Sequence, residues 1–112
     1  MLAEHSARGS ALTLRGVQKR RPSLFDLVEQ MKHVRVPTLV MTGDEDDPCI
    51  AASILMKRTI PSAALVMLPR SGHAINLEEP ALFNQFAEQF FHQVESGQWW
   101  SCKIRPTDFP RI

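Results

Sequence analysis

The sequence predicts an α/β fold in which two short parallel strands alternate with helices around one small core. Two apolar, β-prone runs, residues 38–42 and residues 63–68, indicate the strands, and 21 residues lie between Thr42 and Ala64. That separation suits a right-handed βαβ crossover, because parallel strands need a connection of a dozen or more residues. Helical patterns before, between and after the runs give the order helix, strand, helix, strand, helix.

The first helix is predicted over residues 24–33. Apolar residues recur there at i, i+3, i+4 and i+7, counted from Leu24. Ser23 stands directly before this pattern and Asp26 follows three residues later, which resembles a capping box. Pro37 then prevents the helix from continuing into the first strand.

Both strands are bounded by residues that interrupt a sheet. Residues 38–42 stop at Gly43 and residues 63–68 stop at Pro69. The first run is apolar without alternation, so we expect a strand buried on both faces, as in a parallel sheet.

Two more helices complete the predicted domain. Residues 50–59 form a plausible crossover helix that Pro61 must end. From Pro80 to Gly97, a phenylalanine-rich stripe repeats at helical spacing, with proline in the first turn and glycine just past the end. We expect this stripe to be part of the core.

The two ends of the chain lack a clear period. Residues 1–21 are predicted to be an irregular segment, residues 22–97 the folded subdomain, and residues 98–112 an irregular tail that is either draped on the body or disordered.

The bulk composition excludes several classes of function. The chain has 112 residues, with 13 Lys and Arg against 12 Asp and Glu, so its net charge of +1 predicts neither nucleic acid nor an anionic membrane as partner. No run approaches the about 18 apolar residues of a membrane span, and the first residues lack a signal-peptide pattern. Cys49 and Cys102 suit neither a disulfide framework nor a zinc motif. We expect a cytoplasmic protein without a cofactor.

An acidic residue and a histidine follow the two strands at corresponding places. Asp46 lies four residues past the first run and His73 five residues past the second. The carboxyl ends of parallel strands share one sheet edge and neighbouring strands lie about 4.8 Å apart, so the two side chains are within hydrogen-bond reach. The residues alone favour a solvated acidic turn, and Asp44 and Asp47 remain alternatives to Asp46. Too few ligands are visible to predict a metal site.

The two loops, Gly43-Asp44-Glu45-Asp46-Asp47-Pro48 and Ser71-Gly72-His73, together with the Glu-Glu-Pro that precedes the last helix, resemble the C-terminal third of an α/β-hydrolase. The resemblance runs over residues 22–97. It implies that Asp46, in a Gly-x-x-Asp pattern, is a triad acid and that His73, in a Gly-His pattern, is the triad histidine. The implied parent activity is hydrolysis of a small ester, or of a related bond in a carbon-carbon, haloalkane or epoxide substrate.

Each group would have a distinct role in such a triad. Asp46 would accept a hydrogen bond from one ring nitrogen of His73, and His73 would take a proton on the other. Gly72 would allow a tight turn before the imidazole. Cys49 is interpreted as a buried, inert thiol. The remaining histidines are interpreted as ordinary loop histidines without a catalytic role: His5, His33 and His92.

The sequence departs from the family because no Gly-x-Ser-x-Gly occurs in it. Without a nucleophile, we expect weak activity or none from the chain alone. A two-stranded sheet would leave the strand at residues 38–42 with a bare edge, which predicts a homo-oligomer formed through that edge or through apolar helix faces. A small-molecule substrate is expected only if a nucleophile-bearing half completes the site. The alternatives are a non-catalytic oligomeric or binding module, or one half of a split hydrolase.

Overall fold

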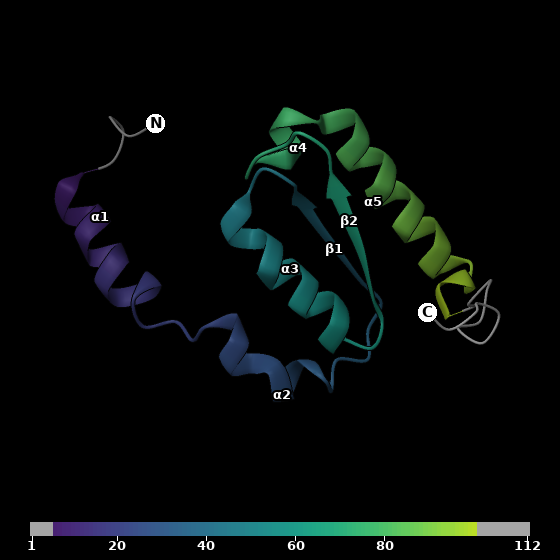
Figure 1. Ribbon diagram of the computed structural model, residues 1–112, viewed down its shortest axis with the longest axis horizontal. Coiled ribbons are helices and arrows are strands. Elements are labelled where there is room, and N and C mark those ends of the chain that lie inside the picture. Colours follow the sequence, from purple (N-terminus) through teal and green to yellow (C-terminus); the bar gives the residue numbers. More distant parts are fainter. Residues whose placement is uncertain (1–5, 101–112) are drawn as a thin grey trace, which may run out of the picture.

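The centre of the molecule is a pair of parallel strands joined by one helix (Figure 1). The computed structural model describes residues 6–100. Strand β1 (Thr38–Gly43) pairs with β2 (Ala63–Leu68), with Thr38 opposite Ala63 and Gly43 opposite Leu68. Helix α3 (Asp47–Thr59) connects them and begins three residues earlier than predicted, because Pro48 fits its first turn. The predicted α/β class and parallel sheet are confirmed.

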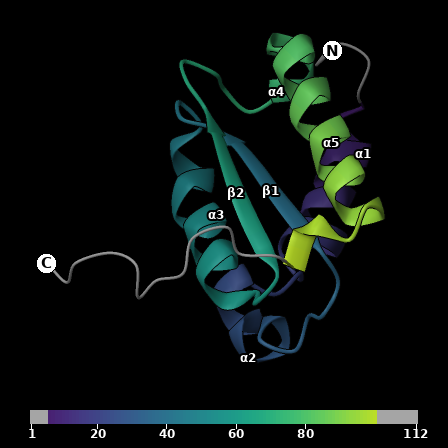
Figure 2. The same ribbon diagram turned by 90° about the vertical axis from the view of Figure 1, so that its right-hand side faces the viewer.

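Helices lie on both sides of this sheet. In both views α3 lies on one side, and α5 (Pro80–Glu95) lies on the other (Figures 1 and 2). A one-turn helix, α4 (Ile75–Glu78), precedes α5 and was not predicted, because four residues are too short to show a period. None of the helices in residues 6–100 has the length and apolarity needed to cross a membrane.

The predicted first helix is divided into two short pieces. A 3₁₀ turn, η3 (Leu24–Leu27), leads into α2 (Val28–Met31), so the helical segment ends two residues earlier than predicted. The predicted capping box is present: the Ser23 N–H donates to Asp26 Oδ2 at 3.1 Å, and the Ser23 Oγ accepts from the Phe25 N–H at 3.3 Å. These bonds satisfy backbone donors that the first turn leaves free.

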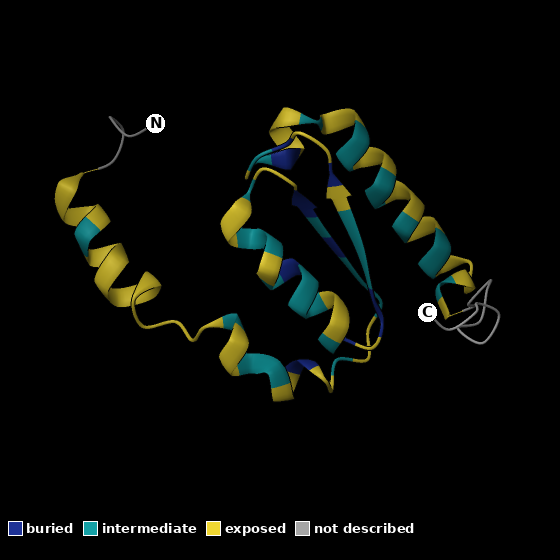
Figure 3. Cartoon of the chain, in the orientation of Figure 1, coloured by how far each residue is buried: buried dark blue, intermediate teal, exposed yellow. Residues whose placement is uncertain are grey.

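The prediction of an irregular N-terminal segment was wrong. Residues 7–18 form helix α1 (Ala7–Thr13) and the π-helix η2 (Leu14–Gln18). The Ser6 Oγ accepts from the Gly9 N–H at 2.9 Å and caps the start. Neither piece has a buried residue, as Figure 3 shows. The helix was not predicted because the sequence of this segment shows little of the apolar periodicity by which an amphipathic helix is recognised.

Helix α5 forms as predicted, but its phenylalanine stripe is not core. The helix has no buried residue, and Phe91 is 59% exposed. The stripe is half-buried because, within residues 6–100, the other elements cover it only loosely. Gly97 has φ +76°, a left-handed conformation that suits the residue just after a helix.

The predicted irregular tail begins with a 3₁₀ turn, η4 (Gln98–Trp100), which lies on the body. The Trp99 ring packs edge-on against the Phe90 ring, with 4.9 Å between the ring centroids, and the Trp99 Nε1–H donates to the Ser62 carbonyl at 2.9 Å. The rest of the predicted tail, residues 101–112, lies outside the described residues.

One cluster of buried apolar residues lies at the amino end of the sheet. Met31, Ile60 and Ala63 are buried together, and half-buried side chains from η3, α2 and α3 pack around them. The prediction that the first strand is buried on both faces was wrong. Val40 and Thr42 are buried, whereas Leu39 and Met41, which alternate with them, are half-buried, because α3 is the helix of residues 6–100 that packs closely against the sheet.

Strand β1 has a free edge in the described part of the chain, where the sheet has two strands. The Thr38 N–H donates to the Ser62 carbonyl at 3.4 Å, and the Asp44 N–H donates to the Leu68 carbonyl at 3.0 Å. Since alternate residues of a strand point their backbone groups to opposite edges, the even-numbered residues of β1 bond to β2. Leu39 and Met41 therefore direct their N–H and C=O groups to the opposite, free edge.

Candidate functional site

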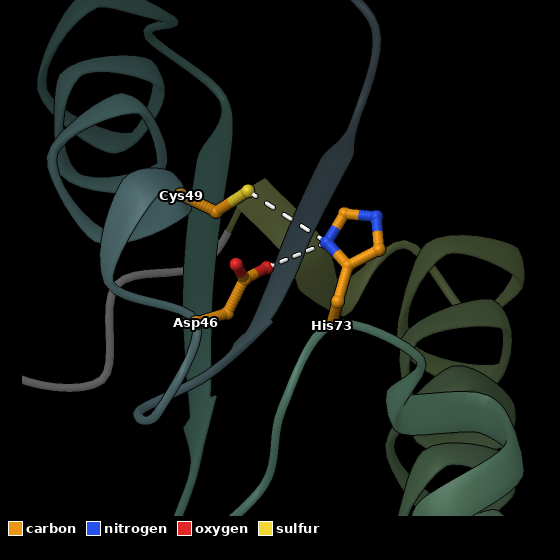
Figure 4. Close-up of side chains that lie close together, drawn as sticks. All are labelled: Asp46, Cys49 and His73. Atoms are coloured by element: carbon orange, nitrogen blue, oxygen red, sulfur yellow. Dashed lines mark hydrogen bonds and ion pairs between the residues drawn. The ribbon is translucent and has the colours of Figure 1, made fainter.

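Asp46 and His73 meet at the carboxyl end of the sheet. Asp46 occupies the N-cap position of α3, and His73 lies in the loop between β2 and α4. The His73 Nδ1 is 2.8 Å from Asp46 Oδ2 (Figure 4). The Asp46 side chain is 12% exposed and the His73 side chain is 84% exposed. The carboxylate is therefore largely enclosed, whereas the imidazole projects into solvent.

Backbone hydrogen bonds join the acid loop to the histidine loop. The Glu45 N–H donates to the Ser71 carbonyl at 2.9 Å, and the Asp44 N–H donates to the Leu68 carbonyl at 3.0 Å. Within the acid loop, the Asp46 N–H donates to the Gly43 carbonyl at 3.2 Å. The distance between carboxylate and imidazole is thus set by main chain on both sides.

Gly43 is the point of closest approach between the two loops. A Cβ built on Gly43 would lie 2.2 Å from the Ser71 carbonyl oxygen and 2.4 Å from that of Gly72. Both atoms belong to the backbone, and Ser71 itself is fully buried, so they cannot easily move aside. Only glycine fits between β1 and the histidine loop at this position.

The histidine loop turns at Arg70 rather than at Gly72. Arg70 has φ 54°, in the left-handed region, whereas Gly72 does not. The Gly72 N–H donates to Glu78 Oε2 at 3.0 Å, and a Cβ on Gly72 would lie 3.1 Å from that oxygen. Gly72 therefore allows the close approach of the Glu78 carboxylate. Glu78 is a site residue that sequence reasoning missed, because it belongs to the unpredicted helix α4.

Cys49 is a third member of the site. Cys49 lies one helical turn after Asp46, and its Sγ is 4.0 Å from His73 Nδ1 (Figure 4). A hydrogen bond with the Cys49 thiol, followed by one with His73, lowers the pKa of Asp46. The same contact with Asp46, together with partial burial, raises the pKa of Cys49. Cys49 is half-buried, whereas the sequence predicted a buried thiol.

The other candidate residues do not join this cluster. Asp44 and Asp47 are exposed, and among the described residues Asp46 is the acid that hydrogen-bonds to His73. His33 and His92 are exposed residues of other segments. His5 lies outside the described residues.

A small cavity adjoins the three side chains. It has a volume of about 240 Å³ and is lined by Asp46, Cys49 and His73 together with residues of β1 and α3. Ligand pockets usually measure about 300–1,000 Å³. The space in this part of the chain is therefore enough for a small group and too small for most whole substrates.

Comparison with known proteins finds relatives that resemble part of this chain. No family profile matches the chain. It is 28% identical over 74 residues to a Bacillus subtilis protein named "Putative 2-succinyl-6-hydroxy-2,4-cyclohexadiene-1-carboxylate synthase", covering 66% of this chain and 26% of that protein. It is also 29% identical over 72 residues to the proline iminopeptidase of Saccharolobus solfataricus, covering 64% of this chain and 23% of that enzyme.

A solved structure extends the comparison to three dimensions. MenH from S. aureus matches with a TM-score of 0.60 and 25% identity, over 62% of this chain and 26% of the MenH chain. In sequence and in fold, this chain is similar to one part of the α/β-hydrolases. It spans about a quarter of the length of the relatives it matches.

Proposed function

We propose that this α/β-hydrolase-like segment carries the acid and the histidine of a Ser-His-Asp type triad. The observation that supports this most directly is the 2.8 Å contact between Asp46 Oδ2 and His73 Nδ1. With a proton on Nδ1, this hydrogen bond fixes the tautomer in which Nε2 is the free base. Nε2 points away from the carboxylate (Figure 4) and is available to a nucleophile.

The parent activity we propose is hydrolysis of a small ester or of a related bond. The relatives are named as a synthase and an iminopeptidase, so the shared fold serves more than one reaction. The cavity beside His73 supplies only part of a binding site. Walls contributed from outside residues 6–100 would therefore select the substrate.

The segment is expected to be weak or inactive by itself. Cys49 is a potential nucleophile in contact with His73, and its sulfur lies beside Nδ1 rather than Nε2. An imidazole that accepts a proton through Nε2 cannot activate a thiol on its Nδ1 side while Nδ1 bonds to Asp46. A separate nucleophile, supplied by a second half, would complete the triad.

Ester hydrolysis tests the proposal. The whole chain would be assayed with p-nitrophenyl acetate, alone and mixed with the remaining, nucleophile-bearing part of the B. subtilis relative. We expect turnover only in the mixture, reduced at least about 100-fold by His73→Ala and reduced by Asp46→Asn, whereas His92→Ala has no effect. Turnover in the mixture that persists in His73→Ala would contradict the triad role.

A second proposal, a self-associating or binding module, has its own support. Large apolar side chains are exposed on several elements of the described residues, with Phe25 at 60%, Leu77 at 75% and Phe91 at 59%. These side chains, together with the free edge of β1, are typical of a surface that is covered in an assembly. A cytoplasmic location also remains a proposal, supported by the free thiol of Cys49 beside the site.

A further inference from the structure

Three different metal-ligand atoms converge on one point beside the sheet. One carboxylate oxygen of Asp46, the Sγ of Cys49 and a ring nitrogen of His73 all lie within 4.8 Å of one another (Figure 4). Asp46 and Cys49 lie one turn apart at the start of α3, and the Cys49 N–H donates to the Asp46 carbonyl at 2.9 Å. Two of the ligands are therefore fixed to each other by the helix, and the third comes from the histidine loop.

We infer that Asp46, Cys49 and His73 bind a divalent ion of the zinc class. A sulfur, an imidazole nitrogen and a carboxylate oxygen together favour Zn²⁺ or Co²⁺ over Mg²⁺ and Ca²⁺, which prefer sites made only of oxygen. This inference does not rest on the proposed hydrolase function, because it concerns only the ligand atoms.

The distances suit such an ion after small side-chain rotations. Tetrahedral zinc holds these ligand atoms about 3.3–3.6 Å apart, given bond lengths of about 2.0–2.3 Å. The structure has one ligand pair closer than this, at 2.8 Å from Asp46 Oδ2 to His73 Nδ1, and one wider, at 4.0 Å from Cys49 Sγ to His73 Nδ1. A shift of about half an ångström in each pair reaches the range. The largely exposed His73 ring has room for that shift.

The site leaves one coordination position open. Three protein ligands with a fourth position toward solvent are the arrangement of zinc sites that also hold water or a small ligand. The cavity of about 240 Å³ adjoins all three side chains and can hold that fourth ligand. Because the ion would use His73 Nδ1, binding replaces the hydrogen bond between Asp46 and His73.

Cobalt titration of the whole chain tests the inference. The Cys102→Ala background leaves Cys49 as the single thiol, so thiolate-to-cobalt absorption reports on this residue alone. We expect one Co²⁺ per chain, displaced by Zn²⁺ and not by Mg²⁺. Cys49→Ala should abolish the thiolate band, and His73→Ala and Asp46→Asn should each weaken Co²⁺ binding at least about tenfold. The matched controls Asp44→Asn and His92→Ala should bind as the background does.

Two results would overturn the inference: a folded background protein without a thiolate band, or a His73→Ala variant that binds Co²⁺ as tightly as the background does. Far-ultraviolet circular dichroism establishes that each variant is folded. If Cys49→Ala does not fold, imidazole ¹⁵N resonances of the background protein decide the question. Zn²⁺ should shift Nδ1 of His73 and leave the His92 resonances unchanged, and an unshifted His73 Nδ1 would refute the site.

Discussion

Gly43 gives the sharpest test of how the site is held together. Replacing it with alanine places a Cβ 2.2 Å from the Ser71 carbonyl oxygen and 2.4 Å from the Gly72 carbonyl oxygen. Because contacts of this kind below 3.0 Å essentially never occur, the histidine loop must withdraw from β1 by at least 0.8 Å. The bond from the Glu45 N–H to the Ser71 carbonyl, now 2.9 Å, would then be stretched or broken.

The cost of that movement follows from the contacts. Overpacking against rigid backbone costs about 1–3 kcal/mol, and a lost backbone hydrogen bond costs about 1 kcal/mol. We therefore expect Gly43→Ala to lower the free energy of unfolding by about 2–4 kcal/mol. The same movement separates Asp46 from His73, so the imidazole should lose its carboxylate partner.

Urea denaturation followed by circular dichroism measures the stability, and imidazole ¹⁵N resonances report whether the His73 hydrogen bond persists. Gly16→Ala is the matched control, because a Cβ on Gly16 meets nothing within 4 Å. This control should be neutral or slightly stabilising, since alanine favours a helical position over glycine. Equal stability of Gly43→Ala and Gly16→Ala would refute the argument from loop contact.

Three further predictions concern single contacts. The pKa of Asp46 is lowered in the folded state, so the ionised carboxylate stabilises the fold at neutral pH, and this stability is lost as the pH falls below about 4. The urea midpoint of the wild type should therefore drop more steeply below about pH 4 than the urea midpoint of Asp46→Asn. Glu78→Ala removes the acceptor of the Gly72 N–H and should lower the unfolding free energy by about 1 kcal/mol, more than Glu78→Gln, which keeps an acceptor oxygen. Trp99→Phe loses the bond to the Ser62 carbonyl and should cost about 1 kcal/mol, whereas Trp100→Phe, at an exposed position, should cost little. Each contact would be refuted if the two proteins compared for it, such as Trp99→Phe and Trp100→Phe, did not differ in urea midpoint.

The sequence alone predicted the parts of the fold that depend on local pattern. Residues 63–68 form a strand with the predicted bounds, and the capping box at Ser23 is present. The pairing of Asp46 with His73 was also predictable, because parallel strands bring the loops at their carboxyl ends to one edge. Each of these features follows from a short pattern or from a rule of topology.

Features that depend on contact between distant segments were not predictable. The need for glycine at position 43 arises from Ser71, and the approach of Cys49 to His73 joins residues 24 apart in sequence. The burial of α5 also failed to follow from its pattern, because an amphipathic stripe shows which face is apolar and not whether anything covers it. That uncovered face and the free edge of β1 raise the same question about assembly.

The register of the sheet allows the assembly to be tested at one edge. Met41 directs its N–H away from β2, and by the same alternation Met67 of β2 directs its N–H to the opposite edge of the sheet. Proline at either position keeps the hydrogen bonds between β1 and β2, because the N–H that it removes does not take part in them. It also removes one N–H donor from an outer edge of the sheet, where a further strand would bind. If copies of the chain associate through β1, Met41→Pro should weaken self-association at least about tenfold in sedimentation equilibrium, whereas Met67→Pro should not. Association through the β1 edge would be refuted if both variants weakened self-association equally, or if the wild type were monomeric. Self-association that neither variant changes would instead point to the apolar helix faces.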